Sequence, residues 1–473
     1  MTLESEKPMR LSQWAHLFYH DDFDHFAIYH SLNIETIFLE NNYKWLIDAF
    51  RSGTTQNALI DKLTDMARED FLEVYDELVR TEIIVPAVSD DMDCLIKKKS
   101  EVISPPHLET LYLLVTDECN LRCKYCLINN CLPQVYSKTF MTWNIAKTAV
   151  DMFFANLLNN PTDTDDSFKN IIFYGGEPLL NFDVIKKVVE YVKSTYQQRL
   201  VDMDGTFRFS VITNGTAITN EVALFLGKHE DVSVTISLDG SKEVNDKKRV
   251  TTTGNGSFDM AIKGLNILKE AGGRSNVAIS CTIDDHNIEH LSELLELQSE
   301  YEFTAINLNP LLETNAVTVD GDYTKNVSNR MLEYFVLARD KGVYEERVMR
   351  KVLSFVNKTI HAFDCQATGT QVVCSPDGKI GTCQEGLGNK NFFFGDVGTN
   401  WSFFEEPVLS EWGKRTPLNM PQCYHCPALG ICGGGCTYNA WLKNGSIWSL
   451  DDKFCVHSLT TLEWLIWDLY ATL

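Results

Sequence analysis

The sequence has no apolar segment long enough to cross a membrane. No apolar run approaches the ~20 residues of a membrane-spanning helix. The first residues, MTLESEKPMRLSQW, lack the apolar core that a secretion signal needs. We therefore expect a cytoplasmic protein with no membrane partner.

Positive charge is also scarce. The chain has 42 Lys and Arg residues against 65 Asp and Glu residues, which gives a formal net charge of -23. Such a surface repels phosphate backbones, so we expect no nucleic-acid partner. Low-complexity tracts and solenoid repeats are absent. A length of 473 residues with 44% hydrophobic content favours two or three folded domains.

Cysteine, in contrast, is abundant, with 14 residues. A chain without an export signal is expected to keep its thiols reduced, so metal ligation is a better explanation than disulfides. Cys94 and Cys281 stand alone, and Cys281, within NVAISCTI, is expected to be a small buried thiol. The others form two groups: Cys119, Cys123, Cys126 and Cys131; then Cys365, Cys374, Cys383, Cys423, Cys426, Cys432, Cys436 and Cys455.

Apolar strands alternate with amphipathic helices from residue 108 to about 310. This pattern is typical of a parallel sheet covered by helices, and six such units predict an α/β fold with a partial (β/α)6 TIM-like barrel. The predicted strands are 108–116, 170–174, 207–213, 232–238, 276–283 and 304–310. The predicted helices are 142–158, 182–196, 219–229, 258–272 and 290–302.

Short polar or glycine-bearing motifs follow five of the six predicted strands. In parallel α/β folds, ligands collect beyond the carboxyl ends of the strands. The sequence therefore predicts one shared pocket built from TDECNLRCKYC, YGGEP, TNGT, SLDG and LNP.

The regions on either side of the barrel (96–312) have other compositions. Residues 1–95 predict a small winged-helix-like α+β domain with a hairpin or short meander at HFAIYHSLNIETIFLE, and 91–106 predicts a linker. Residues 313–364 predict a helical bridge. Residues 365–473 are cysteine-rich with a last helix, SLTTLEWLIWDLY, and we expect bound metal to hold this region together.

Three thiolates at the spacing of Cys119, Cys123 and Cys126 can hold three irons of a cubane cluster and leave the fourth iron open. Structural zinc normally takes four closed ligands, and a thioredoxin-like pair opens a helix without a third upstream cysteine. On count alone, Cys131 is available as a fourth ligand. The spacing thus favours iron-sulfur chemistry over zinc or a redox pair.

Cys119, Cys123, Tyr125 and Cys126 resemble the signature of the radical S-adenosylmethionine (SAM) enzymes. YGGEP (174–178), TNGT (213–216) and SLDGSKEVNDKKRVTTTGNGSFD (from 237) resemble the successive SAM-pocket motifs of that superfamily. The resemblance implies that Cys119, Cys123 and Cys126 hold the catalytic 4Fe-4S cluster. It also implies that an electron from this cluster cleaves SAM to a 5'-deoxyadenosyl radical.

The same resemblance implies the contacts to SAM. Gly175 and Gly176 would let the backbone approach the methionine amine, and Glu177 would add negative charge beside it. Arg249 would pair with the SAM carboxylate. The full set of implied SAM-binding residues is Tyr125, Gly175, Gly176, Glu177, Pro178, Thr213, Asn214, Ser237, Asp239, Arg249, Asn307 and Leu308, of which Tyr125, Asn307 and Leu308 would contact the adenine.

The second cysteine group is similar to the SPASM domain, an appendage of radical SAM enzymes with two further 4Fe-4S clusters. The resemblance assigns Cys423, Cys426, Cys432 and Cys455 to an outer cluster, and Cys365, Cys383 and Cys436 to an inner one. Cys374 is the thiol available as the fourth inner ligand. If Cys374 points away, an open inner iron would suit a substrate thiolate and thioether formation.

Radical SAM enzymes with SPASM domains mostly act on peptides, and residues 1–95 look similar to the leader-recognition element of ribosomal peptide maturases. The resemblance therefore implies a maturase that cross-links a precursor peptide, with HFAIYHSLNI as a candidate edge for leader binding by strand addition. It also implies an external electron donor such as flavodoxin or ferredoxin.

Two alternatives stay open. One is an anaerobic sulfatase maturase, which carries an aspartate base where this chain has Gln384 followed by Glu385. The other is a non-catalytic iron-sulfur protein that binds peptides or relays electrons, which would not cleave SAM.

Overall fold

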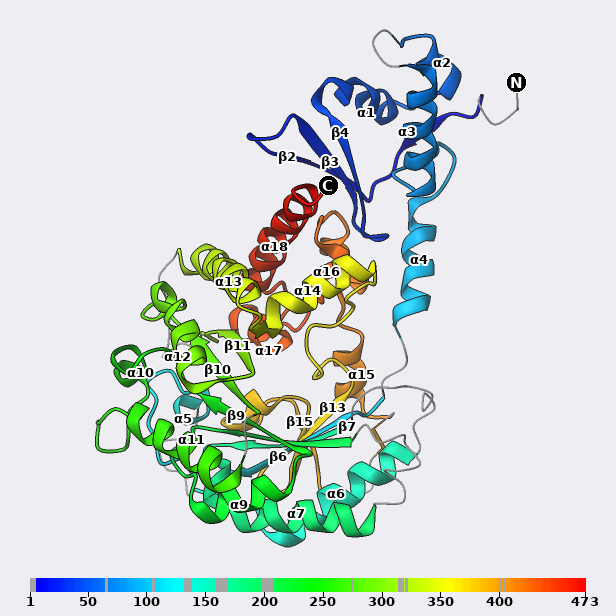
Figure 1. The fold of residues 1–473 in the computed structure, drawn as a ribbon. Coiled ribbons are helices and arrows are strands. Elements are labelled where there is room, and N and C mark those ends of the chain that lie inside the picture. Colours follow the sequence, from blue (N-terminus) through cyan, green and yellow to red (C-terminus); the bar gives the residue numbers. More distant parts are fainter. Residues whose placement is uncertain are drawn as a thin grey trace.

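The six predicted barrel strands are present and adjacent. The computed structural model describes residues 6–63, 67–103, 107–131, 138–158, 169–196, 207–273, 276–313, 319, 322–399, 402–403 and 405–473. Every neighbouring pair is parallel, in chain order (Figure 1). The strands are β6 (Thr110–Thr116), β7 (Lys169–Gly175), β8 (Phe207–Thr213), β9 (Val232–Ser237), β10 (Val277–Ile283) and β11 (Ala305–Pro310).

Helices cover the outer face of these strands (Figure 1). They are α6 (Trp143–Leu158), α7 (Phe182–Thr195), α9 (Asn220–Lys228), α11 (Phe258–Gly272) and α12 (Glu293–Tyr301), as the periodicity predicts. One more short helix, α10 (Lys242–Lys248), lies within the motif that follows β9. Alternate strand residues such as Leu113, Phe173 and Val211 are fully buried in the main core, because strand side chains alternate between the two faces of a sheet.

The sheet continues past the barrel at both edges. On the β11 side it gains β12 (Tyr344–Glu345), which lies between α13 (Tyr323–Asp340) and α14 (Glu346–Asn357) in the predicted helical bridge. On the β6 side it gains β13 (Gln371–Cys374), which pairs parallel to β6, then β14 (Lys379–Gly381) and β15 (Phe393–Asp396). The cysteine-rich region therefore begins as part of a ten-stranded sheet.

The rest of the cysteine-rich region consists of short helices and turns. They are α15 (Pro407–Gly413), α16 (Leu429–Cys432) and α17 (Thr437–Asn444), followed by the long helix α18 (Asp452–Tyr470). The last helix begins six residues before the predicted SLTTLEWLIWDLY and so includes Cys455.

The N-terminal unit has the predicted α+β character. A three-stranded antiparallel sheet of β2 (Ala15–Tyr19), β3 (His25–His30) and β4 (Glu35–Glu40) is followed by α1 (Lys44–Arg51), α2 (Gln56–Ile60) and α3 (Arg68–Arg80). A two-stranded ladder joins β1 (Met9–Leu11) to β5 (Ile84–Pro86). The pattern TQNALIDKLTDMA (55–67) also predicts a helix here, and residues 64–66 of that segment lie outside the described part.

Two sequence predictions for this unit are wrong. HFAIYHSLNI contains β3, which is the central strand, paired to β2 on one side and to β4 on the other. Its backbone groups are already bonded, so it cannot accept an added strand. The predicted linker 91–106 is largely a helix, α4 (Asp91–Val102), whose first turn is capped by Asp90. Leu95 of α4 is fully buried, so this helix packs as part of the structure.

Both faces of the three-stranded sheet are covered. Phe26 and Ile28 pack in a core with α1 and α3. Ala27 and Tyr29, on the opposite face, pack in a core with α16 and α18. The C-terminal end of α18 reaches this sheet in Figure 1, so the last helix packs against the N-terminal unit. Among the described helices, none is long and apolar enough to span a bilayer.

Candidate functional site

The cysteine loop (residues 117–126) leaves the carboxyl end of β6 and is fixed by a second segment, residues 248–251. The backbone N–H of Arg122 donates to the Val250 carbonyl at 2.7 Å, and that of Lys124 donates to the Lys248 carbonyl at 2.9 Å. Leu121 forms a β-bridge with Thr251. These contacts pair residues 121–124 with residues 248–251 as a short ladder of two chain segments, which has two faces.

The three thiols of this loop interact with one another. Burial, then the charges of Glu177, Cys123 and Cys126, raise the pKa of the Cys119 thiol to about 12. Burial likewise raises the pKa values of Cys123 and Cys126. Crowded, buried thiols become thiolates when a cation lies between them, so this set fits a shared iron centre. The side chain of Cys131, at the end of α5 (Leu127–Cys131), lies outside the described part.

The glycines of YGGEP allow two strand ends to meet. A Cβ on Gly175, whose φ is +134°, would lie 2.1 Å from the Thr116 carbonyl oxygen, and one on Gly176 would lie 2.2 Å from that of Glu118. The Gly176 N–H donates to the Thr116 carbonyl at 2.8 Å. Pro178 then begins a short 3-10 helix (Pro178–Asn181). These glycines therefore dock the end of β7 against the cysteine loop.

Glu177 is completely buried and joins two motifs. Its carboxylate accepts hydrogen bonds from the Thr213 hydroxyl at 2.6 Å and from the backbone N–H groups of Asn214 (2.8 Å) and Leu179 (3.0 Å). Burial raises the pKa of Glu177, while these bonds oppose the rise. The carboxylate thus holds TNGT beside YGGEP.

The amide of Asn214 is likewise engaged within the protein. Its Nδ2 donates to Asn120 Oδ1 at 3.0 Å and lies 3.7 Å from Cys119 Sγ. Its Oδ1 accepts from the backbone N–H and the hydroxyl of Thr216. The TNGT motif is therefore tied to the first cysteine of the loop.

Tyr125, Asp239 and Arg249 form a buried network. The Tyr125 hydroxyl and the Arg249 Nε both donate to Asp239 Oδ2, the second at 2.8 Å, and the Thr282 N–H donates to Asp239 Oδ1 at 3.0 Å. The guanidinium also lies over the Tyr125 ring. In the described part of the chain, nothing accepts a hydrogen bond from the terminal nitrogens of Arg249. These nitrogens remain available to a carboxylate ligand.

The last predicted SAM contacts lie on β9 and β11. Ser237, Ser280 and Asn307 are register partners across β9, β10 and β11, so they share one face of the sheet. The Leu308 side chain is fully buried in the main core on the opposite face. Leu308 can therefore contact a ligand in the barrel only through its backbone.

Four C-terminal cysteines come together around α16 and the start of α18. Burial, then the charges of Cys432 and Cys426, raise the pKa of Cys423 to about 12. Burial, then the charges of Cys432, Cys423, Asp451 and Cys426, raise the pKa of Cys455. The structure thus brings together the predicted outer set.

Three further cysteines gather nearer the barrel. Burial and the charges of Glu385, Cys365 and Cys436 raise the pKa of Cys383. Cys374 lies elsewhere, because its side chain is fully buried in the main hydrophobic core. The side chain of its neighbour Val373 packs in a separate group of apolar side chains, which Cys126 contacts. Successive strand side chains point to opposite faces. The structure therefore does not bring Cys374 to the inner set, contrary to its assignment as a metal ligand.

Arg415 is a buried cation close to the C-terminal cysteines. Its side chain is fully buried and donates to the carbonyls of Gly434 (2.7 Å), Ser449 (3.0 Å) and Ile447. Burial lowers its pKa, while the charges of Cys436, Asp451, Cys432 and Cys423 oppose this shift. A buried cation needs compensating negative charge, which an iron-sulfur cluster on these cysteines would supply.

The sequence did not indicate the role of Glu385. Burial raises its pKa to about 7, and its charge raises the pKa values of Tyr174, Cys126 and Cys383. This carboxyl group therefore lies between the cysteine loop and the inner set. In the sequence, Glu385 is marked only by its place two residues after Cys383. Gln384, by contrast, accepts a hydrogen bond from Gln371 at 3.1 Å.

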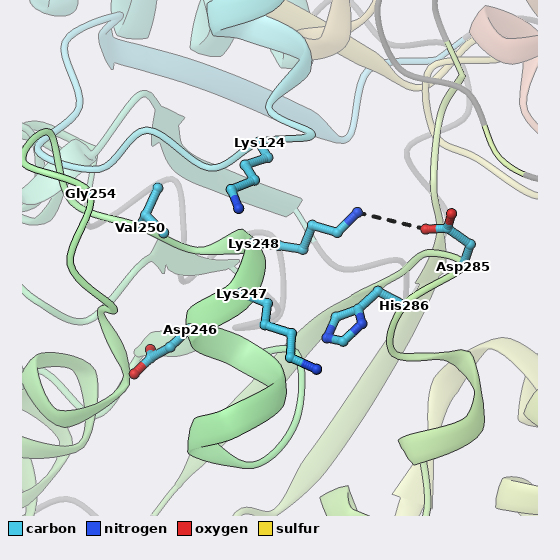
Figure 2. A pocket seen from close by; sticks show the side chains of 8 residues that line it. All are labelled: Lys124, Asp246, Lys247, Lys248, Val250, Gly254, Asp285 and His286. Atoms are coloured by element: carbon cyan, nitrogen blue, oxygen red, sulfur yellow. Dashed lines mark ion pairs between the residues drawn. The ribbon is translucent and has the colours of Figure 1, made fainter.

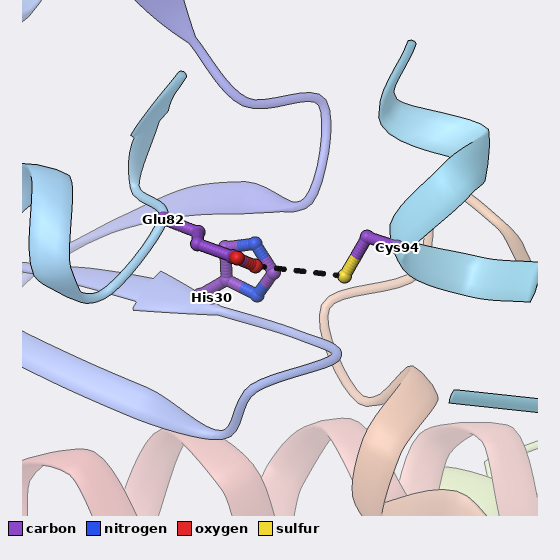
Figure 3. A group of neighbouring side chains, drawn as sticks. All are labelled: His30, Glu82 and Cys94. Carbon is purple, nitrogen blue, oxygen red and sulfur yellow. Dashed lines mark hydrogen bonds between the residues drawn. The ribbon is translucent and has the colours of Figure 1, made fainter. Parts of the chain in front are cut away.

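A separate group of side chains, His30, Glu82 and Cys94, meets in the N-terminal unit (Figure 3). The Cys94 thiol donates to Glu82 Oε2 at 3.8 Å. The Asn33 N–H donates to His30 Nδ1 at 3.0 Å, and burial lowers the pKa of His30 to about 4. The neutral ring therefore carries its proton on Nε2, which makes this nitrogen a donor rather than a metal ligand.

An open cavity of about 670 Å³ lies on the other face of the cysteine-loop ladder. Figure 2 shows the side chains of Lys124, Lys247 and Lys248 around it. Lys248 pairs with Asp284 at 3.1 Å and with Asp285 at 3.6 Å. Lys124 and Lys247 are exposed and have no ion pair with the residues that the structure describes. Two free cations thus lie beside the cysteine loop.

Comparisons with known proteins agree with this architecture. Residues 113–297 match the family model described as the radical SAM superfamily. The chain is 20% identical over 469 residues to the radical SAM cyclopropyl synthase TigE of Paramaledivibacter caminithermalis, covering 95% of this chain and 94% of TigE.

Two solved structures share the fold. The anaerobic sulfatase-maturating enzyme anSMEcpe with bound AdoMet and the Cp18Cys peptide aligns with a TM-score of 0.61 and 19% identity, over 78% of this chain and 98% of that chain. SuiB of Streptococcus suis bound to its precursor peptide SuiA aligns with a TM-score of 0.51 and 15% identity, over 94% and 99%. The second alignment includes the small N-terminal sheet domain.

Proposed function

Because this chain is a radical SAM enzyme related to the SPASM-type peptide maturases, we propose that it forms a thioether or another side-chain cross-link in a ribosomally made precursor peptide. The observation that carries this proposal is the position of Cys374 in the main core, away from Cys365, Cys383 and Cys436. Three ligands leave one iron of an inner cluster open, and a substrate thiolate suits that position.

Cys119, Cys123 and Cys126 would hold the catalytic cluster, and the barrel residues around them would hold SAM. When bound there, SAM supplies a 5'-deoxyadenosyl radical that removes hydrogen from unactivated carbon. Arg249 would orient the SAM carboxylate through its terminal nitrogens while Asp239 holds Nε at 2.8 Å. Ser237 and Asn307 would contact the nucleoside.

Glu385 would be the other candidate for the fourth ligand of an inner cluster, in place of a substrate thiolate. Its carboxyl group lies beside Cys383 and Cys436. The two cases differ in one measurement on the reconstituted protein. A cysteine-containing peptide should change the electron paramagnetic resonance (EPR) spectrum of the inner cluster, whereas a peptide with serine at that position should not. An inner cluster that responds to Glu385→Gln but to neither peptide would contradict the thiolate role.

The leader of the precursor would bind to an open edge of the N-terminal sheet. Both faces of the sheet are covered and β3 is central, so β2 and β4 are the strands that can accept another strand. A photoreactive amino acid at the exposed Tyr19 (β2) or Glu40 (β4) should cross-link to the leader. The same residue at Glu69, exposed on α3, is the control and should not. Failure at both edges would contradict strand addition.

An external one-electron donor would dock beside Lys124 and Lys247. Arg122, Lys124, Lys248 and Val250 form a ladder whose inner neighbour Arg249 contacts Tyr125. The docking surface is therefore one chain layer from the cluster ligands. A chain of net charge -23 repels an acidic flavodoxin or ferredoxin overall, and Lys124 and Lys247, unpaired among the described residues, would attract it here.

Charge reversal tests this docking surface. Lys247→Glu should slow SAM cleavage driven by flavodoxin and leave cleavage driven by dithionite unchanged. Lys187→Glu, on the exposed face of α7, is the matched control and should slow neither reaction. Equal rates for Lys247→Glu and the wild type with flavodoxin would contradict the assignment.

Co-expression with a short cysteine-containing peptide encoded beside the gene tests the function itself. Tandem mass spectrometry should find a loss of two hydrogen atoms localised to one residue pair. Conversion of a cysteine to formylglycine, with loss of sulfur, would favour sulfatase maturation instead. Glu385 is the observation that keeps that alternative open, because it places a carboxyl group near the expected base position. An unchanged mass in ordinary water, together with the gain of one deuterium at a single residue in deuterated water, would indicate epimerisation.

A further inference from the structure

The N-terminal sheet covers the segment that carries three of the four outer cysteines, residues 423–432. Tyr29 of β3 is fully buried, with ring centroids 6.1 Å from Phe355 and 6.4 Å from Phe18. The core to which it belongs includes Ala428, and Cys426 packs against this core. The sheet face opposite α1 and α3 therefore lies directly on the ligand segment.

Other contacts hold the N-terminal sheet against residues 423–432. The Trp14 ring meets Tyr424 edge-on at 6.2 Å, and Lys99 Nζ donates to the Tyr424 hydroxyl at 3.3 Å. A Cβ on Gly430 of α16 would lie 2.4 Å from the Ser31 carbonyl oxygen. Backbone is thus packed against backbone, which a mobile lid does not allow. The sheet is a fixed wall of the outer cysteine site.

The Tyr29 hydroxyl is a donor without an acceptor. It is buried and has no hydrogen-bond partner among the residues that the structure describes. A phenol is protonated at neutral pH and can donate a hydrogen bond, and Cys426 packs against the same core as the Tyr29 ring. A buried hydroxyl left unpaired costs about 1 to 3 kcal/mol, and buried polar groups in proteins rarely stay unpaired. Among the cysteines of the outer set, Cys426 is the one that packs against the core of Tyr29, so its sulfur is a candidate acceptor.

We propose that the Tyr29 hydroxyl donates a hydrogen bond to a sulfur of the outer cluster, either Cys426 Sγ or a bridging sulfide, and that the N-terminal sheet thereby sets the reduction potential of this cluster. The proposal rests on the proposed function and on the outer 4Fe-4S cluster that the SPASM resemblance assigns to Cys423, Cys426, Cys432 and Cys455. A hydrogen bond to sulfur stabilises the more negative, reduced state. Tyr29 is thus a positioning residue that acts through the cluster.

An EPR-monitored redox titration of the reconstituted holoenzyme tests this role. Tyr29→Phe keeps the ring that packs on Phe18 and Phe355, so it removes only the donor. We expect the potential of one cluster to shift to a more negative value and the other two to stay constant. Tyr334→Phe is the matched control, because the Tyr334 hydroxyl is also buried without a partner in the described part, but in the main core. It should shift no potential.

The failures of the two proposals are distinguishable. Three unchanged potentials in Tyr29→Phe, with iron content equal to that of the wild type, would overturn the hydrogen bond and leave the clusters standing. The second failure concerns the wild-type protein. If it holds fewer than about twelve irons per chain because the outer cysteines carry none, the cluster assignment is overturned, and this inference with it.

Discussion

Arg415 makes a large and testable contribution to the cysteine-rich region. Its fully buried guanidinium donates to three carbonyls, those of Gly434, Ser449 and Ile447. Each hydrogen bond to a charged group contributes about 1.5 to 3 kcal/mol. Arg415→Met removes all three and also the cost of burying the cation. We expect a net loss of about 3 to 5 kcal/mol, the range for breaking a buried charge interaction, concentrated around Cys423, Cys432 and Cys436.

The assay is iron and sulfide analysis of protein reconstituted without oxygen. We expect the iron content of Arg415→Met to fall from about twelve per chain to about eight. The segments that carry the outer cysteines lose the hydrogen bonds that hold them and a neighbouring positive charge. Arg415→Lys keeps the charge but reaches fewer carbonyls and should give an intermediate value. Arg330→Met is the control, since that half-exposed side chain pairs with surface glutamates, and with no other carboxylate among the described residues. Full iron content and unchanged thermal stability in Arg415→Met would refute the reasoning.

Three further outcomes follow from the geometry. Cys374→Ala should keep its full iron, whereas Cys383→Ala should lose about four irons; iron loss in the first variant would place Cys374 at a cluster after all. Glu177→Gln turns an acceptor toward the Asn214 N–H into a donor and should weaken SAM binding at least tenfold, about 1.4 kcal/mol, by equilibrium dialysis. Gly430→Ala should push the β3–β4 turn away and speed proteolysis of the N-terminal unit; an unchanged digest would contradict the tight docking.

The sequence predicted the barrel because both of its signals are local. Buried parallel strands such as Thr110–Thr116 are mostly apolar, and the helices between the strands keep a 3.6-residue period. Strand order within the N-terminal sheet was not accessible in this way. HFAIYHSLNI alternates like an edge strand, but β3 is central because Ala15–Tyr19 adds a third strand, which its sequence pattern does not predict. Helix α4 was missed because its lysine-rich outer face resembles a linker.

For the candidate site, the sequence supplied the residues but not their partners. Asp239 and Arg249 were expected to reach SAM separately, whereas they bind each other beside Tyr125. Thr213 was expected to face the ligand, whereas its hydroxyl donates to Glu177. Such pairs connect residues far apart in the chain, and a single sequence carries no information on which polar side chains are consumed by each other. The Cys374 orientation depended on strand phase, which one short strand does not define.

The parallel pairing of β6 with β13 has a consequence for biogenesis. Thr110 of β6 and Gln371 of β13 are register partners. Strand β6 is synthesised early, so it cannot pair with β13 until most of the chain has left the ribosome. Contacts between such distant residues form slowly, because the loop-closure entropy is lost before they form. Until then β6 is an unprotected sheet edge that can aggregate. A C-terminal truncation before β13 would therefore damage the catalytic barrel itself, even though every one of the six barrel strands would still be encoded.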